Sequence, residues 1–280
     1  MSMDMEKLVE QITREVCARL NASGYSAPSE GMIVPAGTRV TAKEIAKMID
    51  HSLLKPEMTR QEVLEGCLLA KQYDCATVCV KPCDVEIAKE TLKGSDVLVT
   101  TVIGFPHGHH LTPVKVMEAD IAIAQGCEEL DLVMNIGRLK SGDYNYVESD
   151  IRTVCDFAHR KNVIVKVILE NAYLTDEEKV KACEICEHAG ADFVKTSTGY
   201  AKGGATIHDL KLMRKTCSDK VRVKAAGGVR TLDGALAVRA VGGVRFGCTA
   251  TKKIVEDARQ REREGTLKIP DSVQELTAGY

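Results

Sequence analysis

Two lysines each end a short apolar segment of this sequence, Lys195 in ADFVK and Lys224 in VRVK. If these segments are neighbouring parallel strands, about 4.8 Å apart, the two amines lie close together. Nearby like charge and partial burial both disfavour the protonated form of an amine. We therefore expect one lysine to be partly a free amine near neutral pH, as Schiff-base catalysis requires. The pattern does not say which of the two is the nucleophile.

Other charged residues interrupt similar segments. Asp50 stands near the end of one, and Asp131 lies in the centre of EELDLVMN. Alternation along a strand places Asp131 on one face with Asn135, and Lys166 on one face with Glu170. Such charges are costly to bury unless they are paired. Internal ion pairs would explain any one of them, but several on neighbouring strands favour an active site.

Glycine-containing turns follow three consecutive β-like segments, in STG (197–199), GG (227–228) and GCT (247–249). Backbone N–H groups in such turns, and at the helix that the last one opens, bind anions. The alternative is that the glycines only permit tight turns. Three such turns in succession favour a phosphate site. The candidate phosphate-binding residues are Gly199, Gly227, Gly228, Gly247 and Thr249.

These residues need elements that bring them together. Apolar β-like segments alternate with helical patterns at 113–125, 146–160, 176–189, 207–216 and 232–240. Eight such units predict an α/β fold, a closed TIM (β/α)8 barrel, with its chemistry at the C-terminal strand ends. An open doubly wound sheet would carry a glycine-rich turn after its first strand, where this chain has SLLKP. The predicted strands are 48–51, 76–80, 97–103, 129–135, 163–170, 192–195, 221–224 and 243–246.

The barrel is predicted to span 41–264, with Thr41 and Glu44 as a capping box at its first helix. Residues 1–20 carry an apolar stripe of helical period, so an amphipathic helix is expected there. Residues 21–40, rich in Gly, Ser, Pro and Ala, are predicted to be a flexible linker. Residues 265–280 form a C-terminal tail ending in Tyr280, which is either disordered or reaches over the barrel mouth.

Composition excludes several classes of protein. A net charge of −2 gives no electrostatic reason to expect a nucleic-acid partner. No apolar run reaches the roughly 20 residues of a membrane span, and residues 1–20 lack the apolar core of a secretory signal. The eleven cysteines of so large a chain, Cys183 and Cys186 included, are expected to be reduced thiols. The sequence therefore predicts a soluble, cytoplasmic protein.

Seven blocks of the sequence, in this order, resemble the deoxyribose-phosphate aldolase family over about residues 42–254. FVKTSTG is the most specific string among them. The blocks are DHSLLKP (50–56), VCVKP (78–82), VIGFPHG (102–108), ELDLVMNIGRL (129–139), KVILE (166–170), ADFVKTSTGY (191–200) and KAAGGVRT (224–231).

The resemblance implies a role for each matching residue. Lys195 would be the Schiff-base lysine, Lys224 the lysine that perturbs it, and Asp131 the acid/base that works through a water. The implied reaction is the reversible cleavage of 2-deoxyribose 5-phosphate to glyceraldehyde 3-phosphate and acetaldehyde. No metal or organic cofactor is expected, because the protonated imine is the electron sink. The residues implied to line the site and support proton transfer are Asp50, Ser52, Cys79 and Lys166.

Two other kinds of function fit less well. A metal-dependent enzyme would use His107, His109 and His110, but these lie in one loop with no second ligand group at metal spacing. A barrel kept as a binding or scaffold protein would be expected to lack Lys195 or Asp131, and both are present.

The chain departs from the family pattern at several positions. Ser52 replaces a usual threonine, and Thr249-Ala250 replaces two consecutive hydroxyls, so weaker phosphate binding is expected. Changes that face one site predict an altered acceptor aldehyde, by natural drift or by engineering. The remaining departures are Lys81, His107 and Asn171–Tyr173.

The resemblance does not cover residues 1–20. An amphipathic helix on a linker needs a partner for its apolar stripe, and this one resembles the encapsulation peptides that recruit enzymes into bacterial microcompartments. Its mixed charges lack the basic excess expected for anionic lipid. An oligomerisation arm or a helix docked on its own barrel is the alternative. The expected partners are the two aldehydes, a microcompartment shell, and further copies in a dimer or tetramer.

Overall fold

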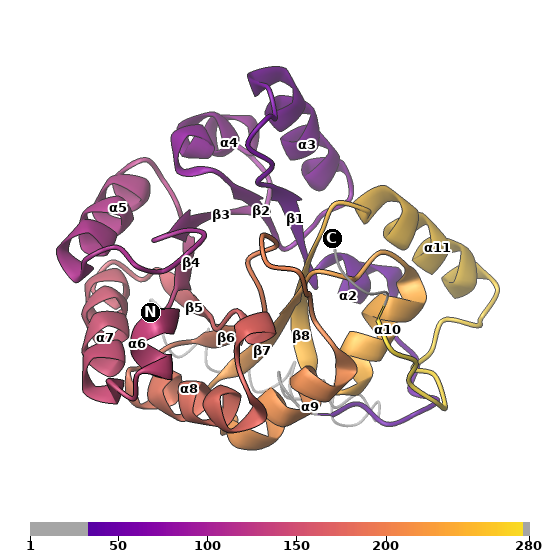
Figure 1. The fold of residues 1–280 in the computed structure, drawn as a ribbon. Coiled ribbons are helices and arrows are strands. Elements are labelled where there is room, and N and C mark those ends of the chain that lie inside the picture. Colours follow the sequence, from indigo (N-terminus) through magenta and orange to yellow (C-terminus); the bar gives the residue numbers. More distant parts are fainter. Residues whose placement is uncertain (1–32, 277–280) are drawn as a thin grey trace, which may run out of the picture. The chain divides into compact units, whose positions relative to one another are not determined.

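The computed structural model describes residues 33–276, which belong to the second of two units, 1–30 and 31–280. Eight parallel strands close into a barrel in chain order, β1 to β8, and the helices surround it (Figure 1). This confirms the predicted TIM barrel. The strands are β1 (Ile49–Leu53), β2 (Thr77–Val80), β3 (Leu98–Ile103), β4 (Glu129–Val133), β5 (Ile164–Ile168), β6 (Phe193–Lys195), β7 (Arg222–Ala226) and β8 (Gly243–Cys248).

Helical segments follow the strands, and the five predicted inside the barrel, at 113–125, 146–160, 176–189, 207–216 and 232–240, are all present. The α-helices are α2 (Ala42–Ala46), α3 (Arg60–Gln72), α4 (Val85–Thr91), α5 (Thr112–Ala124), α6 (Ile136–Lys140), α7 (Tyr144–His159), α8 (Asp176–His188), α9 (Ile207–Thr216), α10 (Leu232–Ala240) and α11 (Thr251–Arg263). Two short 3-10 helices are η1 (Pro82–Asp84) and η2 (Asn171–Tyr173). In the described part of the chain, no helix is long and apolar enough to cross a membrane.

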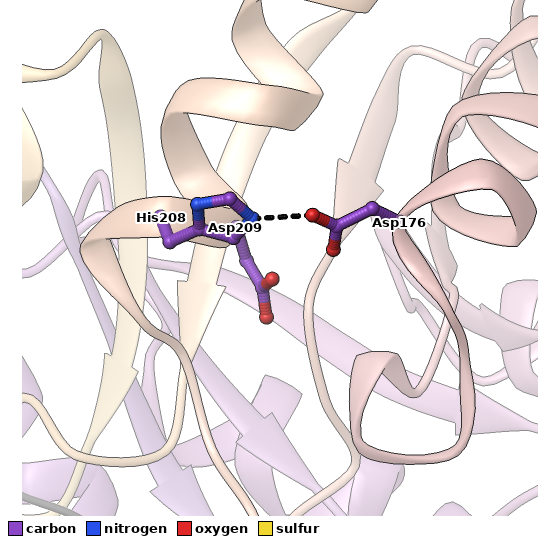
Figure 2. A group of neighbouring side chains, drawn as sticks. All are labelled: Asp176, His208 and Asp209. Carbon is purple, nitrogen blue, oxygen red and sulfur yellow. Dashed lines mark hydrogen bonds and ion pairs between the residues drawn. The ribbon is translucent and has the colours of Figure 1, made fainter.

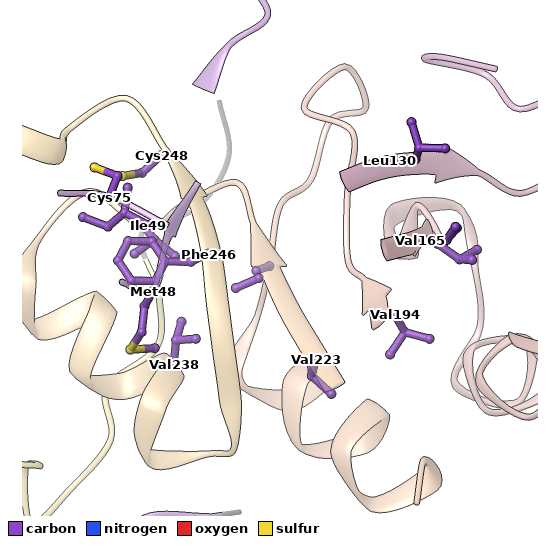
Figure 3. Packing of buried hydrophobic residues seen from close by; sticks show 14 of the residues in the cluster. Met48, Ile49, Cys75, Leu130, Val165, Val194, Val223, Val238, Phe246 and Cys248 are labelled. Atoms are coloured by element: carbon purple, nitrogen blue, oxygen red, sulfur yellow. The ribbon is translucent and has the colours of Figure 1, made fainter. Parts of the chain in front are cut away.

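Alternation along the strands separates an apolar outer face from a polar interior. Outward residues such as Leu130, Val165, Val194 and Val223 are buried against the helices (Figure 3). Residues between them in sequence point into the barrel, where ionisable side chains gather. Burial of the outer face stabilises the closed sheet by about 25 cal/mol per Å² of apolar surface, so the interior is left available for chemistry.

Several predicted strand ends were wrong. β4 ends at Val133, so Asn135 does not share the face of Asp131; instead it caps α6 by accepting from Arg138 N at 3.1 Å. β5 ends at Ile168, and Glu170 adopts a left-handed conformation with φ 56°, which removes it from the strand face of Lys166. β8 runs on to Cys248, so Gly247 lies in the strand, not in the turn after it.

The capping box at the start of α2 is confirmed: Thr41 N donates to Glu44 at 2.6 Å, and Glu44 N donates to Thr41 Oγ1 at 3.1 Å. The end of the predicted linker packs onto the domain. Val34 is buried, and Arg39 forms a bridge with Lys268 in the predicted tail. The helix expected at 1–20 and the terminal Tyr280 lie outside the described residues.

Candidate active site

Lys195 and Lys224 are direct register partners on β6 and β7, as expected for lysines on neighbouring strands. Asp131, on β4, lies between their amines. Its Oδ2 accepts from Lys195 Nζ at 2.6 Å and from Lys224 Nζ at 2.8 Å. All three side chains are buried. The predicted lysine pair therefore shares one carboxylate oxygen instead of facing each other alone.

A second layer of charges supports Asp131. Lys166, its register partner on β5, donates to Asp131 Oδ1 at 3.0 Å and lies 2.5 Å from Glu129. Arg245 on β8 binds Glu129 at 3.1 Å and Asp50 through its Nε at 2.7 Å. Asp50 also pairs with Lys224. The network is continuous across the barrel interior, so each carboxylate has a fixed cationic partner.

When every group is ionised, the network carries one more positive than negative charge. The three carboxylates are Asp50, Glu129 and Asp131, and the four cations are Lys166, Lys195, Lys224 and Arg245. Loss of the Lys195 proton leaves three cations opposite three carboxylates. Because unbalanced charge is costly in a buried site, binding of an anion in the cavity would restore the balance.

The electrostatics assign stable charge states to the neighbours of Lys195. Burial pushes the pKa of Asp131 up, but Lys166, Lys195 and Lys224 outweigh it and hold that pKa well below its ordinary value. Burial lowers the pKa of Lys224, but the charges of Asp131 and Asp50 raise it by more, so the net shift of this pKa is upward. Burial raises the pKa of Cys79 to about 11, so this residue is a neutral thiol at neutral pH.

A cavity of about 480 Å³ opens above this network. Lys195 and Lys224 lie in its lining, together with Asp50, Ser52 and Cys79. Asp131 and Lys166 are not in the lining and lie fully buried. The structure thus places the two lysines at the cavity surface and their shared carboxylate behind them.

All five candidate phosphate residues line the same cavity: Gly199, Gly227, Gly228, Gly247 and Thr249. Gly227 and Gly228 have φ values of 79° and 90°, which require glycine for the turn itself. Turn geometry therefore accounts for the residue type, and the position of both glycines in the cavity lining gives their backbone a further use.

Sequence reasoning missed part of the site. Glu129 and Arg245 belong to the buried network, although a charge inside a β segment is the same signal that identified Lys166. Thr198, Tyr200 and Arg230 also line the cavity. They come from loops, where no periodicity marks a side chain as facing the site.

The departures from the family pattern do not gather at the cavity as expected. Lys81, His107, Asn171–Tyr173 and Ala250 are all absent from its lining. Lys81 Nζ donates to Met58 O at 3.1 Å, and Ala250 lines a separate shallow pocket. Only Ser52, which keeps a hydroxyl, faces the cavity among the noted departures.

Between residues 33 and 276, one group of carboxylates and histidine could hold a metal, formed by Asp176, His208 and Asp209 (Figure 2). Lys179 Nζ already binds Asp176 at 3.0 Å and Asp209 at 2.7 Å. A cation would have to displace this ammonium, so the cluster is an ion-pair link between α8 and α9. The histidines of the 107–110 loop instead stack on one another, His107 on His109 with centroids 5.6 Å apart.

A closed barrel whose interior presents two lysines over one aspartate defines a barrel of the aldolase class. The chain belongs to the DeoC/LacD family of aldolases, whose model matches residues 31–255.

Named relatives agree with this assignment. The deoxyribose-phosphate aldolase of Thermococcus gammatolerans is 52% identical over 221 residues, which are 78% of this chain and 98% of that protein. The Clostridium perfringens protein of the same name is 52% identical over 76% of this chain and 95% of its own length. The tetrameric deoxyribose phosphate aldolase from Aeropyrum pernix superimposes with a TM-score of 0.70 at 28% identity, covering 78% of this chain and 93% of that one.

Proposed function

We propose that this protein is a class I aldolase that reversibly cleaves 2-deoxy-D-ribose 5-phosphate to D-glyceraldehyde 3-phosphate and acetaldehyde. The names of relatives about 50% identical support the substrate. One observation carries the chemistry: a buried amine, Lys195 Nζ, lies in the wall of the cavity and 2.6 Å from a carboxylate. Such a pair supplies a nucleophile and an acid/base at one position.

Lys195 is the proposed nucleophile. Its neutral amine adds to C1 of the open-chain sugar, and loss of water from the carbinolamine gives a protonated imine. This cation occupies the place of the lysine ammonium, so the contact with Asp131 stabilises it. Lys224 keeps its proton, because its pKa is raised by Asp131 and Asp50, and serves as the fixed cation.

The carbon–carbon bond between C2 and C3 then breaks. A base takes the proton of the C3 hydroxyl, the electrons flow into the imine, and glyceraldehyde 3-phosphate leaves an enamine on Lys195. Protonation of the enamine carbon and addition of water release acetaldehyde. We assign the proton transfers to Asp131, acting through a water molecule, with Asp50, Ser52, Cys79 and Lys166 as supporting groups.

The substrate phosphate is assigned to the glycines of two turns, Gly199 and Gly227–Gly228, and to Gly247 and Thr249 at the end of β8. These residues line the cavity, and Thr249 lies two residues before the start of α11, an arrangement that suits an anion. No metal or organic cofactor enters the proposed steps.

The direct test is cleavage of 2-deoxyribose 5-phosphate in the presence of EDTA, with unphosphorylated 2-deoxyribose as the matched substrate. The expected result is metal-independent release of acetaldehyde, with kcat/KM higher for the phosphorylated sugar. Failure to cleave either sugar would remove the proposed function, and equal kcat/KM values would remove the phosphate assignment.

Two finer proposals concern partners. The tetrameric relative from Aeropyrum pernix supports a homo-oligomer, dimer or tetramer, and sedimentation velocity that gave only monomer would contradict it. The apolar stripe of residues 1–20 supports targeting to a microcompartment shell. Residues 1–40 fused to a fluorescent protein should form puncta in a host that makes microcompartments; diffuse fluorescence there would contradict targeting.

A further inference from the structure

Glu170 is a buried carboxylate that the proposed reaction does not use. It follows β5 in a left-handed conformation, φ 56°, which is uncommon for a residue with a side chain. Its side chain turns toward the loop after β6. There both carboxylate oxygens accept from Thr198 N at 3.2 Å, and Oε2 also accepts from the Thr198 hydroxyl. A strained backbone thus aims one charge at one residue of the neighbouring loop.

The contact continues from Thr198 across the cavity mouth. Tyr200 N donates to Thr198 Oγ1 at 3.1 Å, and the Tyr200 hydroxyl donates to Leu54 O at 2.9 Å, in the loop after β1. The rings of Phe105 and Tyr200 meet edge to face, with centroids 5.4 Å apart. Thr198, Tyr200 and Leu54 all line the cavity, although β6 and β1 are not neighbours in the barrel.

We propose that Glu170 is a positioning residue that holds the 198–200 segment as a clasp over the cavity, closed by the contact of Tyr200 with Leu54. The inference rests on the proposed function, because it makes the clasp set the affinity for the phosphorylated sugar. Gly199, a candidate phosphate residue, lies between the two clasp residues. Fixing Thr198 and Tyr200 therefore fixes the Gly199 N–H in the cavity wall.

The clasp requires the ionised form of Glu170. As a carboxylate it accepts from both the N–H and the hydroxyl of Thr198; once protonated it loses acceptor capacity. Burial raises its pKa, opposed by the hydrogen bonds from Thr198 and by the charges of Lys195 on β6 and His107 in the loop after β3. KM should therefore rise as pH falls, and the rise should begin at a higher pH than an ordinary glutamate would cause.

Three variants test the clasp. Glu170→Gln keeps the shape and removes the charge, Tyr200→Phe removes only the donor to Leu54, and Tyr144→Phe removes a hydroxyl from an exposed tyrosine on α7 as a matched control. The measurements are KM and kcat for 2-deoxyribose 5-phosphate as a function of pH, and hydrogen–deuterium exchange of the 197–203 peptide.

Glu170→Gln should raise KM roughly 10-fold at pH 7.5, as expected for a lost charge-assisted hydrogen bond, while kcat changes less. Its KM should lack the rise at low pH that wild type shows; titration of the substrate phosphate is common to both proteins and cancels. Tyr200→Phe should raise KM by a smaller factor, Tyr144→Phe should match wild type, and exchange at 197–203 should accelerate in both clasp variants.

Hydrogen–deuterium exchange distinguishes a failure of the clasp from a failure of the proposed function. If wild type cleaves the sugar but Glu170→Gln leaves KM, its pH dependence and the exchange of 197–203 unchanged, the clasp is wrong. If wild type does not cleave the sugar but exchange accelerates in both variants, the proposed function fails and the clasp stands. If Glu170→Gln does not fold, Tyr200→Phe provides the test. Unchanged KM and unchanged exchange of 197–203 in Tyr200→Phe would also overturn the proposal.

Discussion

Lys195 and Lys224 face each other in direct register on β6 and β7. Asp131 separates their amines by accepting from both through one oxygen. The electrostatic problem of two buried ammonium groups is therefore solved by a third residue from β4. Because that residue is also the proposed acid/base, the group that stabilises the pair is the group that moves the proton.

Removing the second lysine should change the pH dependence of activity. In Lys224→Leu the buried network has three carboxylates and, with Lys195 protonated, three cations, so a protonated Lys195 is fully compensated. The rising limb of kcat/KM should then move to higher pH. Lys224→Arg keeps a cation and should remain near the wild-type profile. Identical profiles for wild type and Lys224→Leu would show that the two lysines are not coupled.

Asp131→Asn should reduce kcat by about 10²–10⁴-fold, the usual contribution of general acid–base catalysis. It also leaves Lys166 and Lys224 with less compensation in a fully buried position, so the free energy of unfolding should fall by about 3–5 kcal/mol. Both are measurable, by steady-state kinetics and by urea unfolding. A kcat within a few-fold of wild type would exclude Asp131 as the acid/base.

His51 predicts a separate effect of pH on stability. Burial lowers its pKa to about 4, and its Nδ1 lies 2.8 Å from the Thr251 hydroxyl at the start of α11. Since the unfolded chain binds the proton near pH 6.5, the neutral form contributes fully above that pH, and stability is lost as pH falls from 6.5 to 4, by about 3 kcal/mol. Unfolding of His51→Gln should show a shallower pH dependence; equal slopes would contradict this account.

Ala250→Ser tests whether the turn after β8 binds phosphate. A restored hydroxyl should tighten the phosphorylated sugar by roughly 1.5–3 kcal/mol at most, the value of a hydrogen bond to a charged group, and leave unphosphorylated 2-deoxyribose unaffected. Ala250 itself lies outside the cavity lining, but its neighbour Thr249 lies in it, so the added hydroxyl tests whether the phosphate site extends to position 250. Equal effects on the two sugars would remove position 250 from the phosphate site.

The barrel was predictable because its strands alternate apolar and polar residues and its helices repeat with period 3.6. The same alternation placed Lys166 and Asp131 inside the barrel. It was misleading at the strand ends: Glu170 and Asn135 continue the pattern in sequence, yet the backbone leaves the strand before them. A left-handed residue and a helix cap depend on partners such as Thr198 and Arg138, which are distant in sequence or local to a loop.

The interior partners of the lysines were less predictable. Arg245 and Glu129 each carry the expected signal, but which carboxylate meets which cation depends on the tilt and closure of the barrel. The contacts of Tyr200 could not be predicted from the sequence, because those with Leu54 and Phe105 join three separate loops. Only the folded barrel brings those loops together.

The central claim is that Lys195 forms the imine. Incubation with acetaldehyde and borohydride, followed by peptide mass mapping, should place one reduced ethyl adduct on the peptide that contains Lys195. Lys195→Ala should give no adduct while keeping the wild-type circular dichroism spectrum. An adduct on Lys224 in the wild-type protein, or trapping of Lys195→Ala at the wild-type rate, would contradict the account.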